Sequence, residues 1–458
     1  MTQDSLRVGF VLLGALICAG LLQGDFMHDH EWLSMSITFL LGYIGIVFET
    51  YFEFNKAAIA LLMSTALWVI YAGTAGTSGI TIPTAIHDLE TKVSEVSEVV
   101  FFLLGAMTIV EIVDAHQGFK VITDKIMAKN KRSLMWIVGL LTFFMSAILD
   151  NLTTTIVMVS LVKKILSNLD DRKLFGAMIV IAANAGGAWT PIGDVTTTML
   201  WINGQISVIP TIESLFLPSL ASLVLSILFL QRNIPKDEMV EEPKALPTQL
   251  APRGQLVFGA GIASLLSVPI FKSLTGLPPY LGMLSGLGIM WTLTDAIHAG
   301  DKDRERLMAP AALRKIDTSG VLFFLGILMS VGALDSAGIL RSVAEFLDNT
   351  FPDRSLIASI IGLVSAVIDN VPLVAATMGM YPITTTPMDS QLWQLIAFCA
   401  GTGGSLLVIG SAAGVALMGI EKVDFIWYVK NITLAALVGY LGGIAVYLAQ
   451  NNLLHAFS

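Results

Sequence analysis

The sequence predicts an all-α polytopic membrane protein, built from two inverted repeats that each contain a re-entrant hairpin and a broken transmembrane helix. Of the 458 residues, 55% are hydrophobic and 13% are charged, against about 25% charged in an average soluble domain. The mean hydropathy is +0.76. This composition excludes an ordinary soluble enzyme and a disordered chain. The net charge of −9, with no basic cluster, excludes a nucleic-acid binder.

Apolar runs long enough to cross a bilayer recur along the whole chain. The first follows Arg7, and no small-residue cleavage site comes after it, so we expect a retained helix rather than a signal peptide. Both cysteines, Cys18 and Cys399, lie inside such runs and are expected to be packing residues. The runs lie at 8–22, 33–52, 57–75, 99–116, 134–162, 174–200, 214–230, 255–271, 281–297, 320–338, 356–380, 392–418 and 426–449.

Two of these runs contain an Asp-Asn pair in their middle. The run 134–162 contains Asp150-Asn151, and the run 356–380 contains Asp369-Asn370. As one straight helix, 134–162 would be about 43 Å long, against a hydrocarbon thickness of roughly 30 Å. Basic residues flank it on both sides, and basic loops stay in the cytoplasm. We therefore expect a re-entrant hairpin from the cytoplasmic side, and for 356–380 a second one from the opposite side.

The two halves of the chain resemble each other. The stretch from Ser146 to Asn151 matches the stretch from Ser365 to Asn370, and the Gly-rich stretch 185–194 matches 402–411. The charge-derived topology runs the halves in opposite directions, as in the inverted repeats of secondary transporters. We divide the chain into an N-terminal helix and outer loop (1–32), a first repeat (33–230), a cytoplasmic linker (231–253) and a second repeat (254–458).

Asp150 and Asp369 are expected at the hairpin tips, where a carboxylate near the bilayer centre costs roughly 2.5–3.5 kcal/mol. One explanation is structural, because Asp and Asn are good N-caps for the returning half-helices. The other is chemical, because carboxylate, amide and hydroxyl oxygens suit a hard cation such as Na⁺ or Li⁺. Hydroxyls are abundant beside the tips, at Thr153 to Thr155 and at Ser365.

The runs 174–200 and 392–418 are expected to be interrupted helices. In the first, Asn184 and Asp194 flank a stretch containing two adjacent glycines and Pro191, and the second is equally rich in glycine. Small residues also allow close helix packing in membranes, which is the alternative explanation. Unwound backbone at membrane depth is tolerated only where it is buried in protein or lines a cavity.

Other polar residues give weaker signals. Asp114 and Asp335 occupy matching positions of the two repeats, and we consider them for gating or a proton path, although both could simply reach interfacial water. The histidines show no metal-ligand spacing, and no catalytic motif is present, so we expect neither an enzyme nor a cofactor.

With these features placed, the chain resembles the NhaD-type Na⁺/H⁺ antiporters of the ion transporter superfamily over nearly its whole length. The resemblance implies a scaffold and a transport domain, a homodimer, and elevator-like movement. The hairpin tips Asp150-Asn151 and Asp369-Asn370 differ from the Ser-Asn-Thr typical of the dicarboxylate symporters, which favours a cation. By the family pattern, the ion- and proton-binding positions are Asp150, Asn151, Asn184, Asp194, Thr196, Ser365, Asp369, Asn370 and Ser405.

The expected function is exchange of Na⁺ or Li⁺ for H⁺ by alternating access, because a buried carboxyl can hold either ion. Three alternatives stay open: a Na⁺-coupled dicarboxylate symporter, an oxyanion permease of the arsenite type, and a cation channel. We expect a bacterial inner-membrane location with a cytoplasmic N-terminus. The expected partners are membrane lipid, the transported ions and a second copy of the chain.

Overall fold

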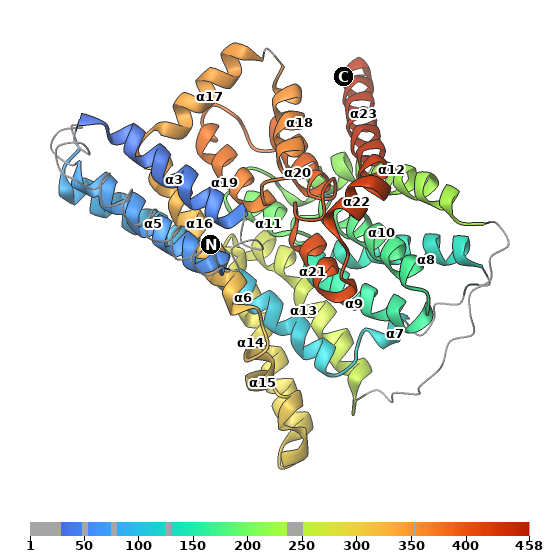
Figure 1. The fold of residues 1–458 in the computed structure, drawn as a ribbon. Helices are drawn as coiled ribbons and strands as arrows, with labels where there is room; N and C mark the ends of the chain where they lie inside the picture. The colour runs from blue at the N-terminus through green and yellow to red at the C-terminus, as the bar shows by residue number, and fades with distance from the viewer. Residues whose placement is uncertain are drawn as a thin grey trace, which may run out of the picture. The chain divides into compact units, whose positions relative to one another are not determined.

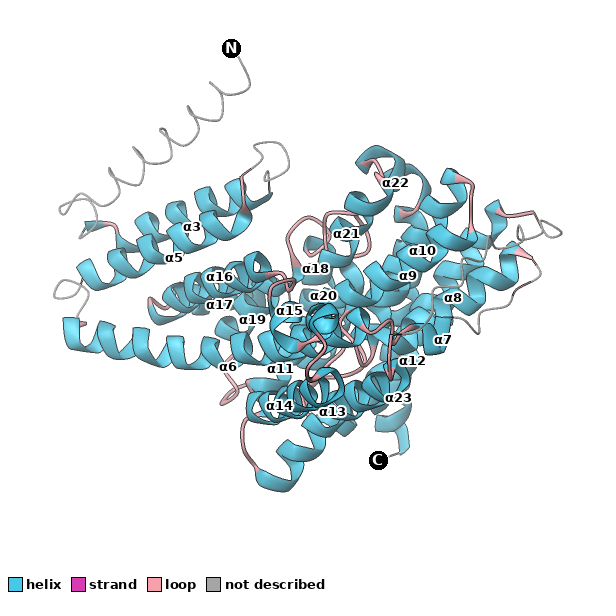
Figure 2. Ribbon diagram, turned by 90° about the horizontal axis from the view of Figure 1, so that it is seen from below, coloured by secondary structure: helices cyan, strands magenta, loops and turns pink. Residues whose placement is uncertain are grey.

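The computed structural model describes residues 29–47, 54–74, 80–123, 128, 130–235, 251–351 and 353–457. Within these ranges the regular elements are helices joined by loops (Figure 2). The run 8–22, Cys18 and most of the linker 231–253 lie outside the described residues. Among the described helices, six are long and apolar enough to cross a membrane, which confirms an all-α polytopic membrane protein.

Many of the helices begin at a residue whose side chain accepts a backbone N–H of the first turn. Such N-caps satisfy donors that have no partner inside the helix. For example, the Asn55 side chain accepts the Ala57 N–H at 2.9 Å, and that of Asp317 accepts the Gly320 N–H at 2.9 Å. Other caps of this kind are Asn130, Asn168, Asp353 and Asp424.

The chain divides into two compact units, and each unit draws segments from both halves of the sequence. The first unit comprises the described residues up to Val100 together with Asp317–Thr350 and Ala375–Pro382. Its helices are α3 (Glu31–Val47), α5 (Lys56–Gly73), the first part of α6 (Ile82–Ala115), α16 (Thr318–Ser336), α17 (Ile339–Thr350) and the end of α19 (Asn370–Met380) (Figure 1).

Within the first unit, α5 packs between α3 and α16. The Trp68 indole N–H donates to the Met329 carbonyl at 2.9 Å, which fixes α5 against α16. Gly326 allows the backbones of these two helices to approach closely, because a Cβ there would lie 2.7 Å from the Ala60 carbonyl carbon. The close approach explains why a glycine stands in the middle of α16.

The second unit contains the remaining described helices and is arranged around α10. Helix α10 is buried continuously from Phe175 to Gly187 and packs against α8, α9, α12, α20 and α21. The bounds are α7 (Lys120–Thr123), α8 (Lys131–Ser146), α9 (Asn151–Ile165), α10 (Leu169–Gly187), α11 (Val195–Ile202), α12 (Val208–Leu230), η1 (Gln231–Asn233), α13 (Gly254–Thr275), α14 (Pro279–His298), η2 (Lys302–Leu307), α15 (Ala309–Leu313), α18 (Arg354–Val364), α20 (Gln391–Gly403), α21 (Ala412–Glu421), α22 (Phe425–Asn431) and α23 (Thr433–Phe457).

All four interruptions expected from the sequence are present. The breaks lie at 147–150, 188–194, 365–369 and 404–411, between α8 and α9, α10 and α11, α18 and α19, and α20 and α21. Two helices differ in extent from the apolar runs that mark them. Helix α6 begins at Ile82 and not near 99, because polar residues such as Glu90 and Glu98 continue the helix. The run 426–449 is divided at Ile432 into α22 and α23.

Candidate ion site

The nine residues predicted to bind ions all lie in the second unit, at or beside the four helix breaks. Direct hydrogen bonds connect the first residue of α9, which follows the break at 147–150, to α10 and to the break between α20 and α21. The Asn151 amide donates to Asn184 Oδ1 at 3.0 Å, and the Asn184 amide donates to the hydroxyls of Ser405 at 2.9 Å and Ser411 at 3.0 Å. All four side chains are buried. The Asn184 side chain therefore uses both of its N–H donors and one of the two lone pairs of Oδ1.

A second polar contact joins the other hairpin tip to the first broken helix. The Asn370 amide donates to Asp194 Oδ2 at 3.2 Å, and both side chains are buried, Asp194 being only 2% exposed. Asp194 is the N-cap residue of α11, but its side chain makes no capping hydrogen bond there. Its carboxylate therefore contacts a residue of another helix break, Asn370.

The internal repeat relates the Asn184–Ser411 contact to the pair Gly401 and Asp194, and these two places differ in chemistry. By the sequence match, Asn184 corresponds to Gly401 and Asp194 corresponds to Ser411. We call each of these two places a half-site. In the first half-site, the Asn184 side chain donates a hydrogen bond to the Ser411 hydroxyl. In the second half-site, a Cβ atom added at Gly401 would lie 3.6 Å from Asp194 Oδ2. In both places the long polar side chain comes from the first repeat and the small residue from the second. One half-site is therefore neutral, and the other contains a carboxylate.

The carboxylates at the hairpin tips act as helix caps in this structure. Asp150 Oδ1 accepts the Thr153 N–H at 2.8 Å and its Oδ2 accepts the Thr153 hydroxyl at 2.6 Å. Asp369 Oδ1 accepts the Val371 N–H at 3.3 Å, a weaker bond. Both side chains are partly exposed. The capping explanation is thus present at both tips, and it is most complete at Asp150.

Ser365 holds the second hairpin to the second broken helix. Its hydroxyl donates to the Ala400 carbonyl at 2.9 Å, just as Ser146 donates to the Ala183 carbonyl at 2.7 Å in the first repeat. The same bond at both matching positions indicates a structural role for the hydroxyl hydrogen. The oxygen lone pairs stay able to accept a bond or to contact a cation.

Glycines make the breaks possible by letting backbones touch. A Cβ at Gly186 would collide with the Phe143 carbonyl oxygen, and one at Gly403 with the Gly362 carbonyl oxygen. A Cβ at Gly193 would lie 2.7 Å from the Ser146 carbonyl oxygen, and one at Gly410 would lie 2.6 Å from that of Ala366. Since these contacts recur at nearly matching positions, the two halves share local backbone geometry. Close packing and an unwound polar site, given as alternatives from the sequence, are combined here.

Three buried threonine hydroxyls near the site have no hydrogen-bond partner within the described structure: Thr154, Thr155 and Thr196. Thr154 and Thr155 lie in the first turn of α9, on the side of Asn151, and Thr196 lies in the first turn of α11. A buried hydroxyl without a partner costs about 1–3 kcal/mol. Such atoms are natural contacts for an ion or a water.

The nine predicted ion-binding positions do not include Ser411, Thr154 or Thr155, although the hydroxyls of Thr153 to Thr155 were noted beside the first tip. Ser411 corresponds to Asp194 in the repeat match, so the sequence did contain a signal for it. No comparable signal separated Thr154 and Thr155 from Thr153, because all three hydroxyls follow the tip directly. In the structure, the Thr153 hydroxyl bonds Asp150 and the other two are left over.

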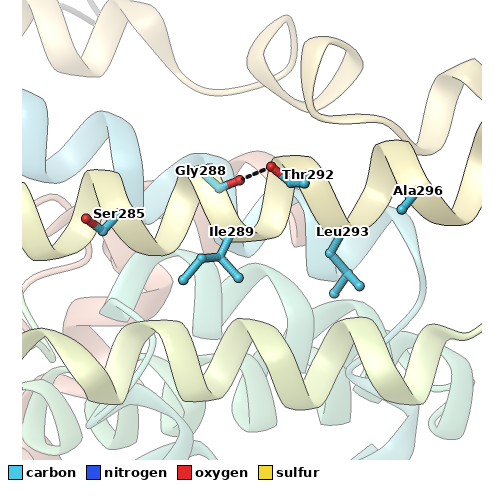
Figure 3. Close-up of a pocket in the computed structure, with 6 residues that line it drawn as sticks. All are labelled: Ser285, Gly288, Ile289, Thr292, Leu293 and Ala296. Carbon is cyan, nitrogen blue, oxygen red and sulfur yellow. Dashed lines mark hydrogen bonds between the residues drawn. The ribbon is translucent and has the colours of Figure 1, made fainter.

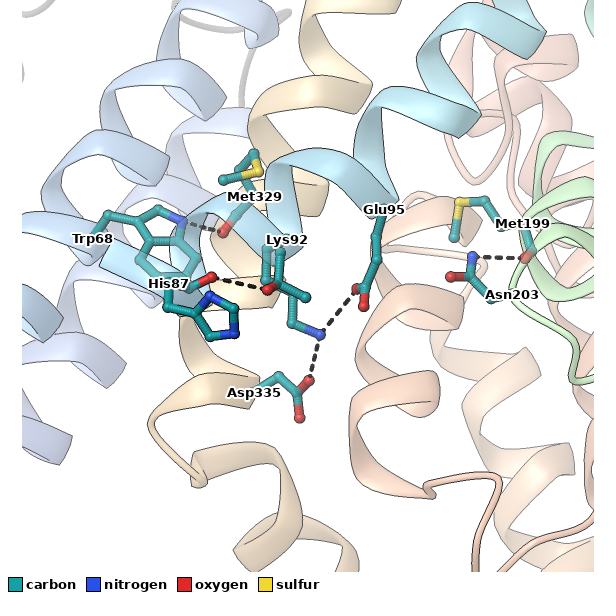
Figure 4. A network of polar contacts seen from close by, with 9 residues as sticks. Trp68, His87, Lys92, Glu95, Met199, Asn203, Met329 and Asp335 are labelled. Carbon is teal, nitrogen blue, oxygen red and sulfur yellow. Dashed lines mark hydrogen bonds and ion pairs between the residues drawn. The ribbon is translucent and has the colours of Figure 1, made fainter. Parts of the chain in front are cut away.

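The two acids considered for gating lie in different units. Asp114 belongs to the second unit, and Asp335, on α16, belongs to the first. Figure 4 shows the Lys92 ammonium of α6 between two carboxylates, at 3.0 Å from Asp335 and 3.1 Å from Glu95. Asp335 therefore joins α16 to α6 by an ion pair. A gating or proton-path role for Asp114 and Asp335 stays a prediction.

The side chains at the helix breaks offer the oxygen ligands that hard cations prefer. They supply carboxylate, amide and hydroxyl oxygens, and no Lys or Arg is among them. Nowhere in the described ranges do three or more His, Cys, Asp or Glu side chains form a group suited to a bound metal. Broken helices that meet around buried polar groups are the arrangement of membrane transporters.

Comparison with known proteins agrees with this class. The family model described as citrate transporter (CitMHS) matches residues 43–401. Sodium/proton antiporter 1 and 2 of Arabidopsis thaliana are 56% and 55% identical over 97% and 91% of this chain, covering 78% and 99% of their own lengths. The Na⁺/H⁺ antiporter NhaD of Vibrio cholerae is 32% identical over 93% of this chain and 94% of its own. The chain therefore belongs to the CitMHS transporter family, in the group that contains the NhaD-type antiporters.

Proposed function

We propose that the chain exchanges Na⁺ for H⁺ across its membrane. The observation that carries this proposal is the buried Asp194 carboxylate, which faces Asn370 at the meeting point of the broken helices. Relatives with 32–56% identity over most of the chain are named Na⁺/H⁺ antiporters, which supports the same assignment.

In this proposal the cation binds in the half-site that contains Asp194. A buried carboxylate must be neutralised, and either a proton or a cation can neutralise it. The two ions therefore exclude each other, which is the basis of exchange. Thr196 would add its hydroxyl. The Asn184 cluster would hold the start of α9 and the second broken helix in place.

Alternating access, elevator-like movement, inverted repeats with re-entrant hairpins, a homodimer and transport of Li⁺ are further parts of the proposal. The division into two compact units, each built from both halves of the chain, supports a moving and a static part. The repeated glycine contacts support an internal duplication. The relatives are named as transporters, and we propose no catalytic activity and no cofactor.

The membrane of origin also belongs to the proposal. Six described helices could span a membrane, so the protein is multi-pass. The bacterial inner membrane and a cytoplasmic N-terminus stay predictions, since the relatives named above come from a plant as well as from a bacterium. Fluorescence of a tagged chain and accessibility of an N-terminal tag would test them.

The second candidate function is transport of a citrate-like anion, which the description of the matched family favours. A multivalent carboxylate needs cationic or N–H-rich partners. The candidate site instead contains the Asp194 carboxylate, on which the Asp369 carboxylate acts electrostatically, and this negative charge would repel an anion. Exchange of a cation is therefore the better supported of the two candidate functions.

Proton flux in proteoliposomes of the purified chain would distinguish the candidates. We expect Na⁺ and Li⁺ to dissipate an imposed pH gradient while K⁺ and citrate do not. Asp194→Asn should lower this flux about tenfold to a hundredfold, since a charge-assisted contact contributes about 1.5–3 kcal/mol. The exposed Asp295 on α14 provides the control, and Asp295→Asn should be unaffected. Flux driven by citrate, or full activity of Asp194→Asn, would refute the assignment.

A further inference from the structure

Two histidines meet inside the second unit, away from the ion site. His116 follows the last residue of α6, and His298 is the last residue of α14. Their Nε2 atoms lie 2.9 Å apart, and the side chains are 0% and 1% exposed. They are 182 positions apart in the chain, so no spacing rule could pair them. A buried imidazole pair of this kind has few protonation states that keep its hydrogen bond.

The contacts of the pair fix its neutral state. His116 Nδ1 lies 2.7 Å from the Ile112 carbonyl, which can only accept, so Nδ1 must carry the hydrogen. In a neutral His116 the Nε2 atom is then bare, and His298 Nε2–H donates to it. This leaves His298 Nδ1 bare as well. That atom is buried and has no hydrogen-bond partner in the described structure.

One added proton fits this arrangement and a second does not. The first can bind the bare Nδ1 of His298, and the Nε2–H···Nε2 bond is kept. The second must bind His116 Nε2, which would place two N–H groups against each other at 2.9 Å. Two cationic rings would then face each other without water between them. We propose that His116 and His298 form a buried site for a single proton, separate from the ion site, and that binding of a second proton opens it and lowers transport.

The charges around the pair are balanced rather than strongly of one sign. On η2, Arg304 pairs with Asp301 at 2.8 Å, and these are the charged groups that act on His298. On α6, Glu111 pairs with Lys315 at 3.0 Å, and Asp114 lies two residues before His116. From α13, the apolar Phe258 packs against Phe119 and Gly118. The ends of α6 and α14 also favour one positive charge.

Burial acts in the opposite direction. It disfavours a charged ring at both histidines, because neither side chain is in contact with water. Since the open form titrates near the ordinary pKa of about 6.5, the closed pair keeps its full stability above that pH. It loses stability as the pH falls below about 6.5, because the open form then binds protons that the closed form does not. The histidine pair should therefore lower transport only at pH values below about 6.5.

The test compares the pH profile of exchange in proteoliposomes for the wild type and for His298→Gln. Glutamine can keep a hydrogen bond to His116 Nε2 but cannot bind a proton, so the repulsive state disappears. We expect unchanged flux at alkaline pH and an acid limb that moves down by about half a pH unit or more, a threefold change in proton concentration. The double variant His116→Gln/His298→Gln should move it no further, because both residues form one site.

Thr292→Val provides the matched control on the same helix. Thr292 lies on the exposed side of α14 beside a shallow pocket, with its hydroxyl donated to the Gly288 carbonyl at 2.9 Å (Figure 3). Its profile should equal that of the wild type. A profile of His298→Gln that superimposes on the wild type would overturn the proposal.

Because the transport readout rests on the proposed exchange, a second measurement uses the wild-type chain without transport. The ¹⁵N resonances of labelled histidine in bilayers should show one imidazole pair that takes up a single proton while its N–H···N bond persists. Two imidazoles that titrate independently near pH 6.5 would contradict the single-proton site, whatever ion the chain transports.

Discussion

At the residue scale, the structure separates two roles that the sequence assigned together to acidic residues at the helix breaks. Asp150 has both carboxylate oxygens bonded to Thr153 and caps α9. Asp194 makes no such cap and faces Asn370. The sequence named both residues, but it could not show that Asp194 meets a side chain 176 positions away. The hydrogen bonds in the structure therefore distinguish Asp150, which is bonded within α9, from Asp194, which also contacts a distant side chain.

Asp150→Asn tests whether the Asp150 carboxylate contributes its negative charge to ion binding in addition to capping α9. Asparagine caps a helix about as well as aspartate, so thermal stability should stay within about 0.5 kcal/mol. Exchange should fall by about tenfold if the carboxylate helps to balance the ion. The melting temperature and the Na⁺-driven proton flux are measured on the same preparation. Undiminished flux would leave Asp150 as a cap alone and would remove it from the ion site.

Thr196→Val tests the unpartnered hydroxyl on α11. Valine has nearly the same shape, so the fold should not lose stability, and removal of an unsatisfied buried group should even raise it slightly. The half-saturating Na⁺ concentration should rise about two- to tenfold, the equivalent of about 0.5–1.5 kcal/mol. An unchanged Na⁺ dependence would show that this hydroxyl does not contact the ion.

At the element scale, the four helix breaks were predictable because each carries a local signal. Asp-Asn pairs mark two of them, and clustered glycines mark the other two. The start of α6 was not predictable from hydropathy, because the helix extends 17 residues beyond its apolar run through polar residues. These polar residues favour a helix although they are not hydrophobic. How closely the broken helices pack was not predictable either, because it depends on glycines that contact the backbone of another helix, as Gly403 contacts Gly362.

Gly403→Ala tests this backbone contact. The added methyl group would collide with the Gly362 carbonyl oxygen, so we expect a loss of stability of about 1–3 kcal/mol or more and a lower melting temperature. Gly419, inside α21, has nothing within 4 Å of its Cβ position. Gly419→Ala should therefore raise stability by about 0.5–1 kcal/mol. Equal effects of the two substitutions would contradict the close contact.

At the scale of the whole molecule, the division into two units crosses the division into repeats. The sequence match separates a first and a second half, but each compact unit contains parts of both. Repeats are found by similarity along the chain, whereas compact units depend on which helices pack together. For the same reason the predicted site residues all fall in one unit although they come from both halves. The sequence predicted the list of residues but not their pairing.

The proposed exchange requires that a Na⁺ ion and a proton compete for the Asp194 carboxylate. Isothermal titration of Na⁺ into the purified chain at near-neutral pH, where a buried carboxyl still holds part of its protons, in two buffers of different ionisation enthalpy, measures the protons released per ion bound. We expect net proton release from the wild type, a much smaller release from Asp194→Asn, and wild-type release from the control Asp295→Asn. Equal release from Asp194→Asn and the wild type would contradict the claim and would place the competing group elsewhere.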